Sequence, residues 1–65
     1  MTLEEWQTVK EGTVLIHLWT NDEYIVLQPI AGDERMGVQR HRLEHTRSGR
    51  KLPPTSDYSL WELKR

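Results

Sequence analysis

The sequence contains no cysteine and no phenylalanine, and it has no long apolar run. Without cysteine the chain can form neither a disulfide framework nor a thiolate zinc site. Apolar runs such as residues 14–16 are far shorter than the roughly 20 residues that a membrane-spanning helix needs. The acidic, amphipathic start of the chain differs from a secretory signal. We therefore expect a cytoplasmic protein that makes no membrane contact.

The chain is also short, with 65 residues and 35% hydrophobic content. A chain of this size forms a single domain, 1–65, and buries only about 60% of the surface that its unfolded form exposes. Three tryptophans and two tyrosines supply the bulk that phenylalanine would otherwise give. This aromatic and β-branched content is too high for a disordered chain, so we expect a folded core.

Net charge is only −1, but the charges are unevenly distributed. Residues 1–34 carry seven acids and one base, whereas residues 35–65 carry eight bases and three acids. Such asymmetry indicates either a charged partner or pairing between the two halves.

The first ten residues carry the signature of a helix. Thr2 and Glu5 have the spacing of a capping box, in which each side chain accepts from the other residue's backbone N–H. A spacing of three places one apolar stripe on the same helical face: Leu3, Trp6 and Val9. The pattern predicts a helix over residues 3–10 that must dock on another element, because so short a helix does not persist alone.

The remaining patterns predict strands over residues 13–19, 24–28, 36–43 and 58–63, with a basic loop over 44–57. The connections are too short for parallel crossovers, which predicts a four-stranded antiparallel meander. The fold class is thus α+β, mostly β, with the short helix packed on the sheet. The result is either an open sheet with a helix or an SH3-like half-barrel. The run from Gly12 to Leu27 resembles small SH3-like domains, without a motif that would transfer site residues.

The first predicted strand has two apolar faces. Val14, Ile16 and Leu18 share one face, which we expect to line the main core. Leu15 and Trp19 lie on the other face, outside that core. Trp19 is then either covered by the docked helix or exposed as an anchor for a protein partner.

The most distinctive segment is basic, with two histidines and one opposing acid, Glu44. Its five cations are Arg40, Arg42, Arg47, Arg50 and Lys51. Arginines make forked contacts to carboxylates or phosphates, so the segment predicts a partner-binding surface. The alternative is a charged hairpin tip that only prevents strand-to-strand aggregation.

The sequence contains no recognisable catalytic or metal-binding motif. His41 and His45 lie four apart in a region that reads as strand and turn, where we expect two half-exposed side chains without a metal. The serines lack a nucleophile-elbow pattern, and the sequence has no phosphate loop or dinucleotide fingerprint. We expect no enzyme activity, no cofactor and no small-molecule substrate.

The sequence thus predicts a small non-enzymatic binding module that modulates or inhibits a larger host or cellular protein. Its size and architecture are analogous to phage-type accessory proteins that act on host transcription or defence machinery. The alternative is a nucleic-acid-binding small β-barrel that uses the Arg40–Lys51 segment. A weaker possibility is that a patch of five acids imitates a phosphate backbone: Glu4, Glu5, Glu11, Asp22 and Glu23.

Overall fold

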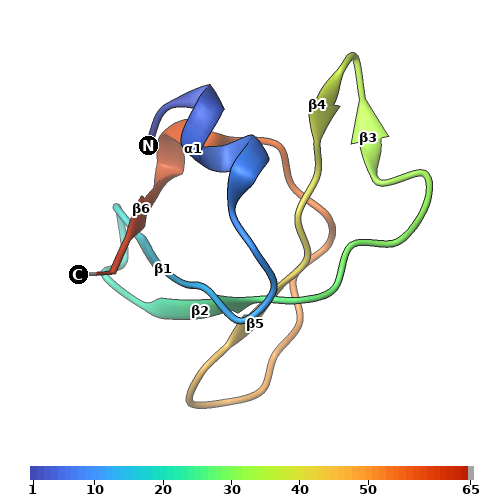
Figure 1. The fold of residues 1–65 in the computed structure, drawn as a ribbon. Helices are drawn as coiled ribbons and strands as arrows, with labels where there is room; N and C mark the ends of the chain where they lie inside the picture. The colour runs from blue at the N-terminus through green and yellow to red at the C-terminus, as the bar shows by residue number, and fades with distance from the viewer. Residues whose placement is uncertain (65) are drawn as a thin grey trace.

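The computed structural model describes residues 1–64 and has the predicted class, a mostly β domain with one short α-helix (Figure 1). The elements are α1 (Leu3–Thr8), β1 (Val14–His17), β2 (Glu23–Val26), β3 (Glu34–Arg35), β4 (Val38–Gln39), β5 (Leu43–His45), the 3-10 helix η1 (Tyr58–Leu60) and β6 (Trp61–Leu63). Within residues 1–64 no helix has the length and apolar character to cross a membrane.

Helix α1 begins with the predicted capping box. The Glu5 N–H donates to Thr2 Oγ1 at 3.2 Å, and the Thr2 N–H donates to Glu5 Oε1 at 2.9 Å. The helix ends at Thr8, two residues before the predicted end, because Val9 adopts an extended backbone. Val9 then packs against the core as the chain leaves the helix.

The main sheet is antiparallel with the order β5-β2-β1-β6. Strands β1, β2 and β5 follow the predicted meander, but β6 pairs with β1 instead of continuing beyond β5. Residues 51–55 run back along β5 through the bridges Glu44↔Lys51 and His41↔Thr55. This return segment occupies the free side of β5, so the last strand finds its open partner at the edge of β1.

The predicted strand 36–43 is divided in the structure. Its first part turns at Met36 and joins β3 and β4 into a separate two-stranded hairpin. Its last residue begins β5, which extends into the predicted loop. The predicted strand 58–63 is likewise strand only from Trp61, because η1 precedes it.

The core consists of five almost fully buried side chains: Trp6, Leu15, Val26, Leu43 and Trp61. The expected orientation of β1 is therefore wrong, since Leu15 is 0% exposed and Leu18 is 49% exposed. Trp6 and Trp61 lie on the same side of the sheet as Leu15 and complete the core there. Val14 and Ile16 are left only partly buried on the outer face.

Two polar contacts fasten α1 to the rest of the domain. The Trp6 indole N–H donates to the Gln39 carbonyl at 2.7 Å, and His41 Nε2 donates to the Trp6 carbonyl at 2.7 Å. The His41 ring also meets the Trp6 ring edge-on, with centroids 4.6 Å apart. His41 is buried at 3% exposure, which corrects the expectation of a half-exposed residue near a hairpin tip.

Candidate functional site

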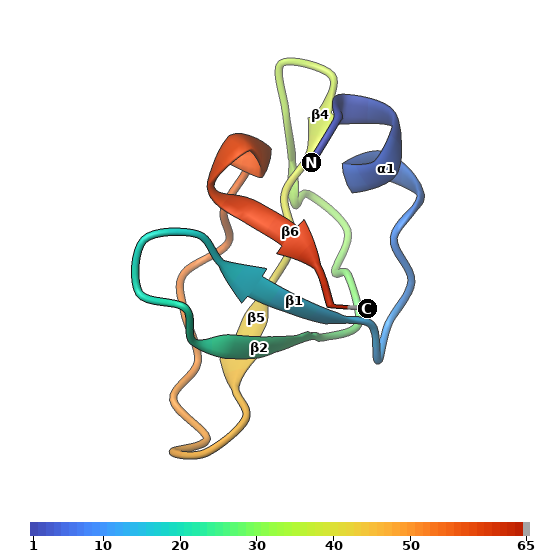
Figure 2. The ribbon, with the colours of Figure 1, turned by 90° about the vertical axis from the view of Figure 1, so that its left-hand side faces the viewer.

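Two turns that are distant in the sequence follow β1 and β5, and both lie at the end of the sheet where β2 begins (Figure 2). The β1–β2 turn covers residues 18–22, and the turn that follows β5 covers residues 46–49. The Thr46 N–H donates to the Glu23 carbonyl at 3.1 Å, which ties the second turn to the start of β2. We call residues 18–22 and 45–51 together the turn end.

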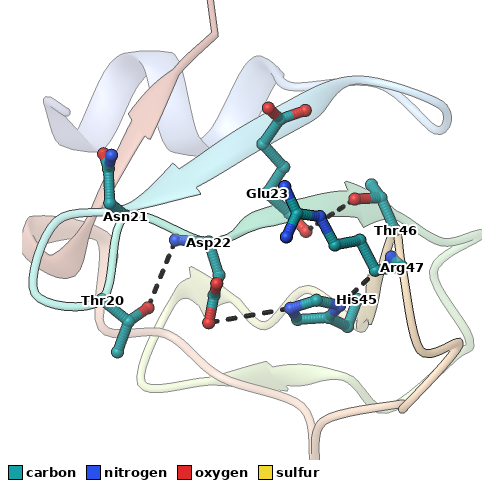
Figure 3. A pocket seen from close by; sticks show the side chains of 7 residues that line it. All are labelled: Thr20, Asn21, Asp22, Glu23, His45, Thr46 and Arg47. Atoms are coloured by element: carbon teal, nitrogen blue, oxygen red, sulfur yellow. Dashed lines mark hydrogen bonds and ion pairs between the residues drawn. The ribbon is translucent and has the colours of Figure 1, made fainter.

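A hollow of about 280 Å³ lies between these turns (Figure 3). It is lined by Thr20, Asn21, Asp22, Glu23, His45, Thr46 and Arg47. These side chains are polar, and they include two carboxylates and one guanidinium. The hollow therefore presents hydrogen-bonding groups of both charges and little apolar surface.

His45 holds the turn end together. The backbone N–H groups of Arg47 and Ser48 donate to its Nδ1 at 3.2 and 3.3 Å. In the neutral ring the proton therefore sits on Nε2, which faces the Asp22 carboxylate at 3.6 Å (Figure 3). The ring also meets Tyr24 edge-on, with centroids 5.0 Å apart. These contacts give His45 a structural role in shaping the turn.

Trp19 projects from the turn end with 83% of its surface exposed. Its backbone is fixed by local bonds, since the Trp19 N–H donates to His17 Nδ1 at 3.2 Å and the Asn21 N–H donates to the His17 carbonyl at 2.8 Å. Asn21 has a φ of 62°, a left-handed conformation that asparagine tolerates better than most residues. Leu18, 49% exposed, lies beside Trp19 in the chain, so a fixed turn displays two neighbouring apolar side chains.

The five cations of the basic segment do not form one surface. Arg42 forms an ion pair with the Asp33 carboxylate, in which Nη2 donates to Oδ1 at 3.2 Å and Nε lies 3.0 Å from Oδ2. Arg40 Nη2 donates to the Gly32 carbonyl at 3.3 Å. These two arginines therefore tie the loop before β3 to the chain that follows β4, at a distance in the fold from the turn end.

The other three cations, Arg47, Arg50 and Lys51, lie exposed at the turn end. Within residues 1–64 none of their side chains forms an ion pair. The Arg50 N–H donates to Ser48 Oγ at 3.2 Å, which shapes the backbone without using the guanidinium. Their charges are thus available to a partner, and Arg47 also lines the hollow.

Asp33 is a structural residue that the sequence interpretation missed. It is only 6% exposed, and one of its oxygens also accepts from the Ile30 N–H at 3.2 Å. In the sequence it lies in a polar, glycine-containing connection and resembles an ordinary turn acid. Its pairing with Arg42 depends on the β3–β4 hairpin between them, which the strand pattern did not predict.

Within residues 1–64 no three histidine, aspartate or glutamate side chains converge on a point that could hold a metal ion. His41 is buried against Trp6, whereas His45 belongs to the turn end. Comparison with protein-family models, curated proteins and solved structures gives no match for this chain.

Proposed function

We propose that this chain is a non-enzymatic binding module that docks its turn end on a larger protein and thereby modulates or inhibits it. The observation that carries this proposal is the exposure of Trp19. The other two tryptophans are at most 2% exposed, whereas Trp19 is 83% exposed on a turn with a defined backbone. A pre-ordered tryptophan loses little conformational entropy on binding and supplies the large buried area typical of interface hot spots.

The cations of the turn end indicate the chemistry of the partner. Arg47, Arg50 and Lys51 attract an acidic protein surface and accelerate its approach. Guanidinium groups also make forked bonds to carboxylates. The partner surface therefore combines a pocket for an indole ring with acidic side chains around that pocket.

Binding to nucleic acid is the second candidate, because exposed cations beside an exposed aromatic ring are also found in single-strand binding sites. Next to Trp19 the aliphatic side chain of Leu18 is 49% exposed, and an aliphatic side chain suits an apolar protein pocket better than a stacked base. The protein partner is therefore the better fit.

The SH3-like half-barrel interpretation is part of the same proposal. A sheet whose last strand returns to pair with its first, as β6 does with β1, supports it. Loops at the end of such a small barrel are positioned by a rigid scaffold and are common binding elements. A cytoplasmic modulator of this kind would resemble phage-type accessory proteins in size and mode of action.

The test is affinity capture from a lysate of the source or host cell, followed by titration of the captured, identified protein. Trp19→Ala should weaken binding by at least about tenfold, as expected for a hot-spot residue. Ile30→Ala is the matched control, since Ile30 is 52% exposed but lies outside the turn end. Equal affinity of the wild type and Trp19→Ala would refute the proposal. A salt slope of nearly one unit per phosphate contact would instead indicate nucleic acid.

A further inference from the structure

The β3–β4 hairpin projects from the body of the domain, on a different side from the turn end (Figures 1 and 2). Its strands pair Arg35 with Val38, so the loop consists of Met36 and Gly37 alone. Both loop residues have positive φ, 54° and 77°, as a type I′ turn requires. Asparagine before glycine is the favoured sequence for this turn, whereas methionine is strained there by its Cβ.

Met36 combines this strain with the greatest exposure among the large hydrophobic side chains. Its surface is 92% exposed, so the rest of the chain covers almost none of it. Neither the backbone conformation nor the side-chain environment therefore favours methionine over asparagine for stability. Residues held in sparsely populated backbone conformations are concentrated at functional sites.

The body of the domain holds the hairpin firmly. Gln7 Nε2 donates to the Gly37 carbonyl at 3.1 Å, directly at the turn. The Trp6 indole N–H donates to the Gln39 carbonyl at 2.7 Å, and the Gln39 side chain donates to the Asp33 carbonyl at 3.3 Å. A projecting side chain on a braced support loses little conformational freedom when it binds.

The chemistry of the hairpin indicates what it meets. Glu34 and Arg35 are its two charged residues, and their charges cancel. Methionine is unbranched and polarizable, so it adapts to irregular apolar pockets. A neutral tip with one flexible apolar side chain suits a protein pocket, and it offers no net attraction to phosphate or to an anionic membrane.

We infer that Met36 is a pre-positioned knob that inserts into an uncharged apolar pocket on a protein partner. This contact is separate from the turn end, and it does not depend on the function proposed for Trp19. Because the tip is neutral, its contribution to affinity is insensitive to salt. The contribution of Arg47, Arg50 and Lys51 falls as salt rises.

The experiment uses the full chain labelled with photoreactive methionine, irradiated in a lysate of the source or host cell. Met36→Asn is the control, because it keeps Met1 and removes only the knob. Cross-linked proteins are identified by mass spectrometry, purified and titrated against the wild type, Met36→Asn and Trp19→Ala at low and high salt. We expect a cross-link that Met36→Asn does not give, and a dissociation constant at least about tenfold higher for Met36→Asn at both salt concentrations.

The melting temperature of Met36→Asn separates loss of binding from loss of folding. It should rise, because asparagine relieves the strained turn. The inference is overturned if the wild type and Met36→Asn give the same cross-links, or if they bind the partner with equal affinity. It is overturned as well if Met36→Asn melts at a lower temperature than the wild type. It is also overturned if the cross-linked species is a second copy of this chain, seen as a dimer in light scattering.

Discussion

Arginine has opposite roles at two places in this molecule. Next to the β3–β4 hairpin, Arg42 forms an ion pair with Asp33, whose side chain is only 7% exposed. At the turn end, Arg47 lies exposed beside a polar hollow, without an ion-pair partner within residues 1–64. Both belong to one basic segment of the sequence. Asp22 and Glu23 line the same hollow, but they pair with His45 and Lys64. The pairing made in the folded chain therefore decides which arginine stabilises the domain and which remains available to a partner.

Truncation of a core tryptophan should have the largest effect. Trp61 is 2% exposed and meets His17 and Tyr24 edge-on, with centroids 4.8 and 5.1 Å away. Trp61→Ala should reduce the free energy of unfolding by about 3–5 kcal/mol. In so small a domain this leaves the chain largely unfolded. Urea denaturation followed by circular dichroism measures the loss.

Trp19→Ala is the control and should stay within about 0.5 kcal/mol of the wild type. If Trp19→Ala lost as much stability as Trp61→Ala, the Trp19 side chain would be packed in solution. Trp19 would then not differ from the core tryptophans.

Removal of the Arg42 side chain should have the next largest effect. Arg42→Ala leaves the buried Asp33 carboxylate with the Ile30 N–H as its remaining hydrogen-bond donor. Since Arg42 is one-third exposed, we expect a loss of about 2 kcal/mol in the free energy of unfolding, measured by urea denaturation. Arg47→Ala, the matched control at the turn end, should change stability by less than about 0.5 kcal/mol.

A double variant tests whether the two residues act as a pair. Asp33→Ala combined with Arg42→Ala should be less destabilising than the sum of the single changes, because each single change already removes the interaction. Strict additivity would show that the interaction between Arg42 and Asp33 contributes nothing to stability.

Loss of the His45 ring should have a smaller effect, confined to the turn end. In His45→Ala the N–H groups of Arg47 and Ser48 lose their acceptor. We expect about 1 kcal/mol less stability and faster hydrogen exchange at these two amides. His45→Asn, which retains a side-chain acceptor, should restore part of the protection. Unchanged exchange in His45→Ala would show that the turn is held by other contacts.

Charge reversal at the turn end should have the smallest effect on stability. Replacing Arg47, Arg50 and Lys51 with Glu should leave the melting temperature nearly unchanged, because surface substitutions usually stay within about 0.5 kcal/mol each. The association rate with an acidic partner should fall, since attraction becomes repulsion. If the triple variant binds as tightly as the wild type, these three cations contribute nothing to binding, and the proposed contact of the turn end rests on Trp19 alone.

Some of the fold could be predicted because it depends on neighbours in the sequence. The capping box of Thr2 and Glu5 closes over three residues, and the β1–β2 hairpin joins adjacent segments. The orientation of β1 could not be predicted in this way. Both of its faces are apolar, so periodicity alone does not distinguish the side of Leu15 from that of Val14 and Ile16.

Some features of the candidate site could also be identified from the sequence, and others could not. Trp19 and the basic segment were identified from residue type, and the exposure of Trp19 was one of two alternatives. The division of the cations could not be predicted, because Arg42 reaches Asp33 only through the unpredicted β3–β4 hairpin. That hairpin was missed since methionine is not a turn-forming residue.

By itself the sequence determined the class of the domain, its N-terminal helix and its first hairpin, because caps and alternation are local properties of the chain. Only the tertiary structure decided which face of β1 is buried, where β6 pairs, and that Arg42 of the basic segment pairs with Asp33. These outcomes depend on contacts between segments far apart in the chain. Their free energy comes from packing and charge pairing in three dimensions, which no short window of sequence contains.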